Sequence, residues 1–173
     1  MPLYLTNQDI TKMNTDAIVN AANTELQNYA RRRGGGVCGA IFRAAGHNEM
    51  QEACNRIGGC ETGNAVITEG FALPAKYVIH AVGPRYEQGN KDQAELLRSS
   101  YIRSLKLAEK FNIQSVAFPL ISSGIFGYPP LEAMYIAVDA LREYLTRNQM
   151  EIYLCIRDEA LLEAAEIYAH KQL

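Results

Sequence analysis

The sequence lacks the marks of a membrane or secreted protein. No apolar run in its 173 residues approaches the roughly 18 residues that span a bilayer. The segment Met1 to Tyr4 has no basic stretch followed by an apolar one, so it does not resemble a signal peptide. Positive charge is not in excess, because 17 lysines and arginines face 19 aspartates and glutamates, for a formal charge of −2. We therefore expect a cytoplasmic protein without a membrane partner, and the charge balance disfavours nucleic acid.

The sequence also has little from which to build a metal site. Its four cysteines include no C-x-x-C pair, and no histidine lies at zinc-ligand spacing from them. We therefore expect no metal, and the thiols are interpreted as small buried hydrophobic groups. Cys38 is singled out because it follows three glycines at the start of a predicted helix, where the helix dipole can lower a thiol pKa.

Nothing in the sequence divides the chain. It contains no repeat, low-complexity tract or linker at which a second domain would begin. The chain has 173 residues, 48% of them apolar, and is long enough to fold alone. A domain of this length buries about 70% of the surface of its unfolded chain. We predict one domain over residues 1–173, and we expect a monomer.

Short apolar or β-branched runs alternate with segments of helical periodicity. Six runs are predicted strands: Leu3–Thr6, Ala17–Ala21, Ala65–Thr68, Tyr77–Val82, Ser115–Ile121 and Ile152–Ile156. Two apolar stripes predict helices: Leu97, Tyr101, Leu105 and Ala108, then Met134, Ala137, Val138, Leu141 and Leu145. A last helix is predicted from about Glu159 to Lys171. The order predicts an α/β fold, a three-layer α/β/α sandwich around a mixed, mostly parallel sheet of about six strands, with a ligand crevice at the carboxyl ends of the strands.

Two glycine-rich loops follow predicted strands and are expected to face this crevice. The first, Gly34 to Gly39, lets backbone N–H groups approach a ligand and precedes a helix whose positive end points to the same place. The second, Ser122 to Tyr128, adds two hydroxyl donors and two aromatic rings, which suit a diphosphate with a sugar stacked nearby. Together the loops predict a nucleotide diphosphate, although glycines in either loop can also serve only to make tight turns.

Two better-known phosphate-binding signatures do not apply. The first loop matches G-x-G-x-x-G, but ten residues, Thr24 to Arg33, precede its first glycine, whereas a Rossmann site needs a tight turn directly after the strand. About 20 residues beyond the glycines, at Gly58 to Glu61, no acidic residue ends a strand to hold a ribose. No Gly-Lys-Ser/Thr follows either cluster, so the Walker pattern is absent.

Five motifs occur in a fixed order over nearly the whole chain. They are Asp9–Thr11, Ile18–Asn23, Gly34–Ile41, Val78–Pro84 and Ser122–Tyr128. In this order they closely resemble the macrodomain family and, within it, the MacroD-type branch. Such an ordered set is far more specific than either glycine pattern alone.

The resemblance implies a function. Macrodomains bind ADP-ribose, and many of this branch hydrolyse the ester that joins ADP-ribose to acidic side chains or deacetylate O-acetyl-ADP-ribose. The chain is therefore expected to be a hydrolase, an ADP-ribosylhydrolase or O-acetyl-ADP-ribose deacetylase, that needs no cofactor. Its expected partners are ADP-ribose or ADP-ribosylated protein and O-acetyl-ADP-ribose.

The resemblance also assigns residues to this ligand. Asp9 would accept a hydrogen bond from the adenine amino group, beside the Ile10 amide, unless it is only an exposed carboxylate at a strand end. Asn20 and Asn23 match the family's N-A-A-N motif, in which Asn23 would touch the distal ribose, whereas Asn20 could simply cap a turn. The other expected ligand-binding residues lie in the two loops: Gly35, Gly36, Val37, Ser122, Ser123, Gly124, Ile125 and Phe126.

Two departures from the family pattern concern catalysis. Cys38 stands where the best-known hydrolases have an aspartate thought to activate water, and Phe42 stands where a histidine is common. We therefore expect Asn23 to be catalytic by positioning the ribose while a ligand phosphate oxygen orients water. A sharper alternative makes Cys38 catalytic, as a thiolate base or nucleophile. The lost aspartate also leaves open an ADP-ribose reader without catalysis.

A third departure is the segment Gln27 to Arg33, which is longer than the family's usual link between these motifs. Its Arg31, Arg32 and Arg33, with Tyr29 nearby, could meet the modified protein, an extra phosphate or a nucleic-acid strand. A solvated, mobile loop is the alternative. An RNA-binding module is accordingly the third and weakest hypothesis.

Overall fold

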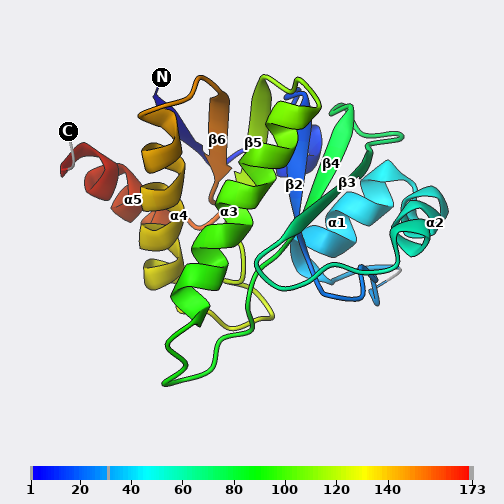
Figure 1. The fold of residues 1–173 in the computed structure, drawn as a ribbon, viewed down its shortest axis with the longest axis horizontal. Coiled ribbons are helices and arrows are strands. Elements are labelled where there is room, and N and C mark those ends of the chain that lie inside the picture. Colours follow the sequence, from blue (N-terminus) through cyan, green and yellow to red (C-terminus); the bar gives the residue numbers. More distant parts are fainter. Residues whose placement is uncertain (1, 31, 172–173) are drawn as a thin grey trace.

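The strands of the protein form one mixed sheet (Figure 1). The computed structural model describes residues 2–30 and 32–171. Its strands are β1 (Leu3–Thr6), β2 (Ala17–Ala22), β3 (Ala65–Glu69), β4 (Tyr77–Val82), β5 (Ser115–Pro119) and β6 (Glu151–Cys155). They are arranged in the order β1-β6-β5-β2-β4-β3, and all neighbours are parallel except the edge strand β3, which is antiparallel to β4. The predicted mixed, mostly parallel sheet is confirmed.

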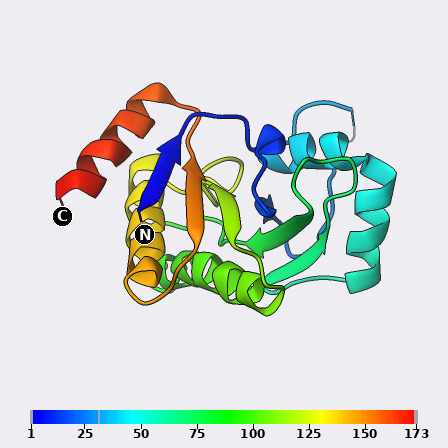
Figure 2. The ribbon, with the colours of Figure 1, turned by 90° about the horizontal axis from the view of Figure 1, so that it is seen from above.

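Helices cover both faces of this sheet. They are α1 (Gly36–Ala45), α2 (His47–Ile57), α3 (Gln93–Lys110), α4 (Pro130–Leu145) and α5 (Glu159–Lys171), with a short 3-10 helix η1 (Ile10–Lys12) after β1. Helices α1 and α2 pack against one face and α3 and α4 against the other, while α5 packs on α4 and β1 (Figure 2). This is the predicted three-layer sandwich. No helix of the described ranges is both long and apolar enough to cross a bilayer.

The strands are continuous apolar runs because both faces of the sheet are covered. On β2, for example, Ala17, Ile18 and Val19 are all fully buried. The predicted helical stripes are also core, since every member of the Leu97 stripe on α3 has no exposed surface. Pro130 begins α4, where the fixed φ of proline suits the first turn of a helix.

Strand β5 ends two residues earlier than predicted, and β6 ends one residue earlier. Strand β5 stops at Pro119, although the apolar run continues to Ile121. The reason is Tyr101 of α3, whose fully buried hydroxyl accepts the Ile121 N–H at 2.9 Å and donates to the Pro119 carbonyl at 3.4 Å. Helix α3 therefore takes over the backbone hydrogen bonds where the strand ends, and it anchors the loop that follows.

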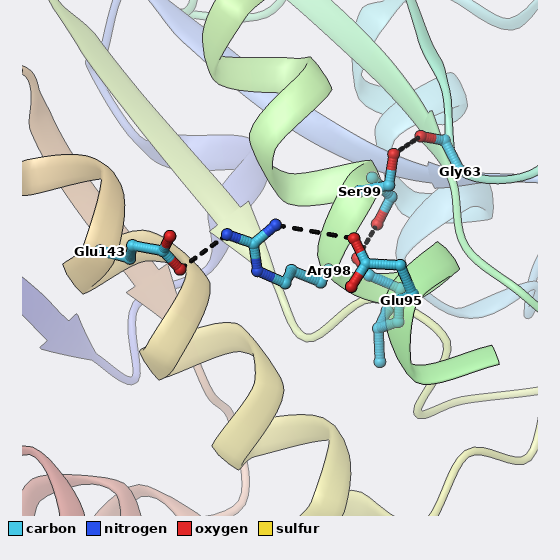
Figure 3. Close-up of polar contacts among 7 residues, drawn as sticks. Gly63, Glu95, Arg98, Ser99 and Glu143 are labelled. Atoms are coloured by element: carbon cyan, nitrogen blue, oxygen red, sulfur yellow. Dashed lines mark hydrogen bonds and ion pairs between the residues drawn. The ribbon is translucent and has the colours of Figure 1, made fainter. Parts of the chain in front are cut away.

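Polar contacts on the surface hold α3 in position (Figure 3). The Arg98 guanidinium lies 2.6 Å from a Glu143 carboxylate oxygen on α4 and 3.7 Å from Glu95 on its own helix. One residue along, the Ser99 hydroxyl donates to the Gly63 carbonyl at 2.8 Å, just before β3. Exposed ion pairs of this kind add little stability, so their contribution is to align α3 with its neighbours.

Candidate functional site

A cleft of about 640 Å³ opens at the carboxyl ends of the parallel strands β2, β4, β5 and β6. Its lining residues are Ala21–Asn23, Gln27–Ala30, Gly35–Cys38, Gly83, Arg85, Pro119–Phe126, Cys155–Asp158 and Leu161. The predicted position of the crevice is confirmed. Both glycine-rich loops border it, so the two segments singled out from the sequence do meet in space.

The first glycine-rich loop presents backbone to the cleft. Gly35 has φ +73, and a Cβ there would lie 2.5 Å from the Ala30 Cβ, so the position requires glycine on two grounds. Helix α1 begins at the next residue, and no side chain caps it. The first N–H groups of a helix have no partner within the helix, and their partial positive charge favours an anion. The loop therefore offers an anion-binding helix end at the cleft wall.

The second loop, Ser122 to Tyr128, is closed by its own backbone. Tyr128 N–H donates to the Ser122 carbonyl and Gly127 N–H to the Gly124 carbonyl, both at 2.9 Å. The N–H groups of Gly124, Ile125 and Phe126 have no hydrogen-bond acceptor among the described residues. Three successive N–H groups at a cleft wall are donors for a phosphate.

The hydroxyls of this loop are used differently from the prediction. Ser123 Oγ donates to the Leu120 carbonyl at 2.8 Å, so its hydrogen is already engaged. Ser122 Oγ is buried without a hydrogen-bond partner in the described structure. It packs closely on Gly83, where a Cβ would lie 2.2 Å from it. The expectation of a free hydroxyl donor is wrong for Ser123, whose hydrogen is engaged within the loop, whereas for Ser122 it stays a prediction.

Phe126 is fixed from behind by the loop after β4. The Arg85 guanidinium carbon lies 4.4 Å from the centre of the Phe126 ring, and the Tyr86 N–H donates to the Phe126 carbonyl at 2.8 Å. A guanidinium stacks favourably on an aromatic face at this distance. The aromatic side chain expected over the distal ribose is therefore held at the cleft by two contacts from a neighbouring loop.

Asn23 lines the cleft at the end of β2. Its amide nitrogen donates to the Gln27 carbonyl at 2.9 Å, and its oxygen accepts the Gln27 N–H at 3.0 Å. An asparagine amide has a second hydrogen and a second lone pair, so the side chain is oriented and can still bind a ligand.

Asn20 is placed behind the cleft wall. It is 1% exposed and does not line the cleft; its amide nitrogen lies 3.0 Å from His80 Nδ1 and 3.8 Å from Cys38 Sγ. His80 is fully buried on the paired strand β4, and its Nε2 lies 3.0 Å from the Thr68 hydroxyl, which donates to the Glu69 carbonyl. Burial lowers the pKa of His80 to about 4. The histidine is therefore neutral, with its proton assigned to Nε2 because Asn20 donates to Nδ1.

Cys38 lines the cleft, but its thiol is not activated. Burial raises the pKa of Cys38, against a smaller opposing effect of the Asn20 hydrogen bond. The prediction that the pKa is lowered at this helix start is wrong, because burial of the thiol disfavours its charged form. At neutral pH the group is a thiol.

The adenine-side residues lie next to the cleft rather than on its wall. The Asp9 carboxylate accepts the N–H and hydroxyl of Thr11 at 3.0 and 2.8 Å, so it caps η1. These hydrogen bonds lower the pKa of Asp9, as does Arg157, which lines the cleft after β6. Ile10 is buried, at 5% exposure.

The arginine-rich segment borders the cleft through Tyr29 and Ala30. Arg31 lies outside the described residues, while Arg32 and Arg33 are exposed. Arg43 of α1 donates to the Ala30 carbonyl at 3.0 Å and to the Gly34 carbonyl at 3.0 Å, which ties the two sides of the segment together.

Arg85 and Arg157 are site residues that sequence reasoning missed. Both line the cleft: Arg85 is the third residue after β4, and Arg157 is the second after β6. The position of Arg85, immediately after the Val78–Pro84 motif, could have indicated that it belongs to the site. No group of three metal-ligating side chains occurs in the part of the chain that the structure describes.

Comparison with known proteins shows which family has this sequence and fold. The family model of the Macro domain matches residues 19–137. A macro domain-containing protein of Chlorobaculum tepidum is 48% identical over 162 residues, covering 92% of this chain and 91% of the relative. A Citrobacter rodentium protein named O-acetyl-ADP-ribose deacetylase is 46% identical over 163 residues, covering 91% of this chain and 89% of that protein.

Solved structures agree with the sequence comparison. The Oceanobacillus iheyensis macrodomain with ADP superposes with a TM-score of 0.89 at 35% identity, covering 98% of this chain and 92% of that one. The Trypanosoma brucei macrodomain in complex with ADP gives a TM-score of 0.80 at 37% identity, covering 95% and 66%. The five ordered motifs, the fold and the matched family model lead to one conclusion: this chain belongs to the macrodomain family.

Proposed function

We propose that this protein is a single macrodomain over residues 1–173 that binds ADP-ribose in the cleft between its two glycine-rich loops. One observation carries the proposal: the uncapped start of α1 and the unpartnered N–H groups of Gly124, Ile125 and Phe126 border the same cleft. Two such donor sets suit the two phosphates of a diphosphate. The solved macrodomains of Oceanobacillus iheyensis and Trypanosoma brucei that hold ADP support this ligand.

The strand order supports one orientation of the ligand. Asp9 and Arg157 follow β1 and β6, whereas Asn23 and Arg85 follow β2 and β4. Adenine near Asp9 and the distal ribose near Asn23 would therefore lie at opposite ends of the cleft. The diphosphate would lie between them, at the loop before α1 and the loop after β5. Phe126, held by Arg85, would cover the distal ribose.

We further propose that the protein hydrolyses esters of ADP-ribose that bind in this cleft. Water would add across the ester bond of ADP-ribosylated carboxylate side chains or of O-acetyl-ADP-ribose, releasing a carboxylic acid and a ribose hydroxyl. The protonated Cys38 thiol is a poor base, so a ligand phosphate oxygen would orient the water while Asn23 holds the ribose. The relatives named O-acetyl-ADP-ribose deacetylase support this activity.

A reader without catalysis is the second candidate, and Cys38 favours it. A protonated thiol stands at the cleft wall where a carboxylate would be expected to activate water. Such a protein would recognise ADP-ribosylated protein and leave the linkage intact.

One preparation distinguishes the two candidates. ADP-ribose affinity is measured by calorimetry, and release of ADP-ribose or acetate is followed from an automodified acceptor and from O-acetyl-ADP-ribose. The hydrolase proposal predicts binding together with release from at least one of them. Binding without release from either would leave the reader, and no binding would contradict both.

A further inference from the structure

An exposed arginine and exposed apolar side chains gather at the β2–β4 end of the cleft. We define the acceptor rim as Tyr29, Arg85, Ile125 and Phe126, all of which line the cleft. Tyr29 is 77% exposed and Ile125 is 86% exposed, so their apolar surface is available to a partner. Isolated exposed apolar residues are common, but these two border one opening together with a stacked guanidinium.

Arg85 has no ion-pair partner among the described residues. Its guanidinium is positioned on the Phe126 ring, and the Tyr86–Phe126 hydrogen bond holds the backbone of Phe126. A stacked guanidinium keeps its N–H donors at its edge, where a planar carboxylate can bind them. The cation is thus oriented and has donors available for an anion.

The segments that supply the rim carry formal charges of one sign only. The three segments that supply it, residues 27–36, 83–86 and 119–128, contain no aspartate or glutamate. Arg32 and Arg33 are exposed on the first of them, and the tethering of that segment by Arg43 keeps it beside the cleft. The formal charge of the whole chain is −2, so the excess of positive charge is confined to these segments.

From these observations we infer that the acceptor rim binds the polypeptide that carries the ADP-ribose, and that Arg85 selects modified sites flanked by acidic residues. This inference rests on the proposed function, because it takes the distal ribose to lie beneath Phe126. The modified side chain leaves the cleft at that end, so residues next to it in the acceptor would reach Arg85, Tyr29 and Ile125. A peptide supplies both the carboxylates and the aliphatic contacts that this surface suits.

The composition of the rim favours a peptide over a nucleic acid. Single-stranded nucleic acids bind on exposed aromatic platforms. Here the Phe126 ring is stacked by Arg85, and the most exposed apolar residue, Ile125, offers no flat surface for a base. Tyr29 alone remains as an exposed ring of the rim.

The test compares two synthetic conjugates that carry ADP-ribose through a stable linkage. One is flanked by glutamates and the other by the isosteric glutamines, and free ADP-ribose is titrated beside them by fluorescence competition. We expect the native protein to prefer the acidic conjugate by about threefold at low salt, as for an exposed ion pair, and to lose the preference at high salt.

Arg85→Met keeps an aliphatic side chain on Phe126 but removes the charge, and it should reduce the ratio of the two affinities to about one. Arg85→Lys should restore part of the ratio. Arg103→Met, which removes the same charge from an exposed position of α3, is the matched control and should leave the ratio unchanged.

Three other outcomes would contradict the inference or the proposed function. Equal binding of both conjugates by a native protein that binds free ADP-ribose contradicts the inference alone. A native protein that binds none of the three contradicts the proposed function and the inference with it. Tighter binding of an RNA that carries ADP-ribose on its terminal phosphate, lost in Arg85→Met, would replace the peptide by a nucleic acid.

Discussion

At the scale of single residues, the chemistry of the cleft depends on what Cys38 and Asn23 can do. Cys38 is at the wall of the cleft, but burial keeps its thiol protonated. Asn23 is oriented by two hydrogen bonds to the Gln27 backbone and retains bonding capacity toward a ligand. Positioning by Asn23 is therefore better supported than acid–base or nucleophilic chemistry by Cys38.

Replacement of Cys38 by alanine tests that ranking. If ligand phosphate orients the water, Cys38→Ala should change kcat by less than about threefold, whereas Asn23→Ala should reduce it by tenfold or more because the ribose is no longer positioned. Steady-state release from O-acetyl-ADP-ribose measures both. Loss of turnover in Cys38→Ala, with ADP-ribose affinity retained, would assign the chemistry to the thiol after all.

His80 gives the protein a pH-dependent stability. Its pKa is about 4 in the fold, against 6.5 for an ordinary histidine, so the unfolded chain binds more protons between these values. The free energy of unfolding should therefore fall as the pH is lowered from about 6.5 to 4, by about 3 kcal/mol in total from this group. Urea denaturation at several pH values measures the slope.

The matched variant for this slope is His80→Gln, which retains hydrogen-bonding groups but cannot titrate. It is expected to be less stable at pH 7, because buried partners such as Thr68 lose their geometry, and to have a flatter pH profile. A profile as steep as that of the native protein would mean that other groups cause the acid sensitivity.

At the scale of elements, the cleft is made by loops that neighbouring helices hold in place. Tyr101 of α3 takes the backbone hydrogen bonds at the end of β5, and Arg43 of α1 ties Ala30 to Gly34. The loops are therefore presented in a defined shape before any ligand arrives. A preorganised site of this kind loses less entropy on binding than a flexible one.

Gly35 tests the shape of the first loop, and Gly89 is its matched control. Both have positive φ, so the backbone strain of an alanine at either position should destabilise the fold by about 1 kcal/mol, before any clash is counted. Only at Gly35 would the new Cβ meet another atom, the Ala30 Cβ at 2.5 Å, whereas nothing lies within 4 Å at Gly89. Calorimetric titration should show at least a tenfold loss of ADP-ribose affinity in Gly35→Ala and little change in Gly89→Ala. Equal affinities in the two variants would show that the loop shape does not matter for binding.

At the scale of the whole molecule, the sequence predicts the architecture well because its signals are periodic and local. The strands and the two apolar stripes follow from which residues are buried, and the crevice follows from parallel strands ending at one edge. What could not be predicted depends on contacts between segments far apart in the sequence. The burial that raises the pKa of Cys38, the placement of Asn20 behind it and the stacking of Arg85 on Phe126 all come from such contacts.

The resemblance to macrodomains identified the loops correctly but not the role of each atom in them. Both serines after β5 were expected to donate to a phosphate, yet Ser123 bonds to Leu120 and Ser122 is buried against Gly83. A motif states which residues occur, whereas the direction of a hydroxyl depends on the backbone around it. Asp9 caps η1 through Oδ1 alone, and its contact with adenine stays a prediction.

The central claim is that the cleft binds ADP-ribose, and a calorimetric titration of the native protein with ADP-ribose tests it most directly. We expect saturable binding of one ligand per chain, weakened at least tenfold in Asn23→Ala and unchanged in Arg103→Met. Absence of binding to the folded native protein, or binding that Asn23→Ala leaves unaltered, would contradict it.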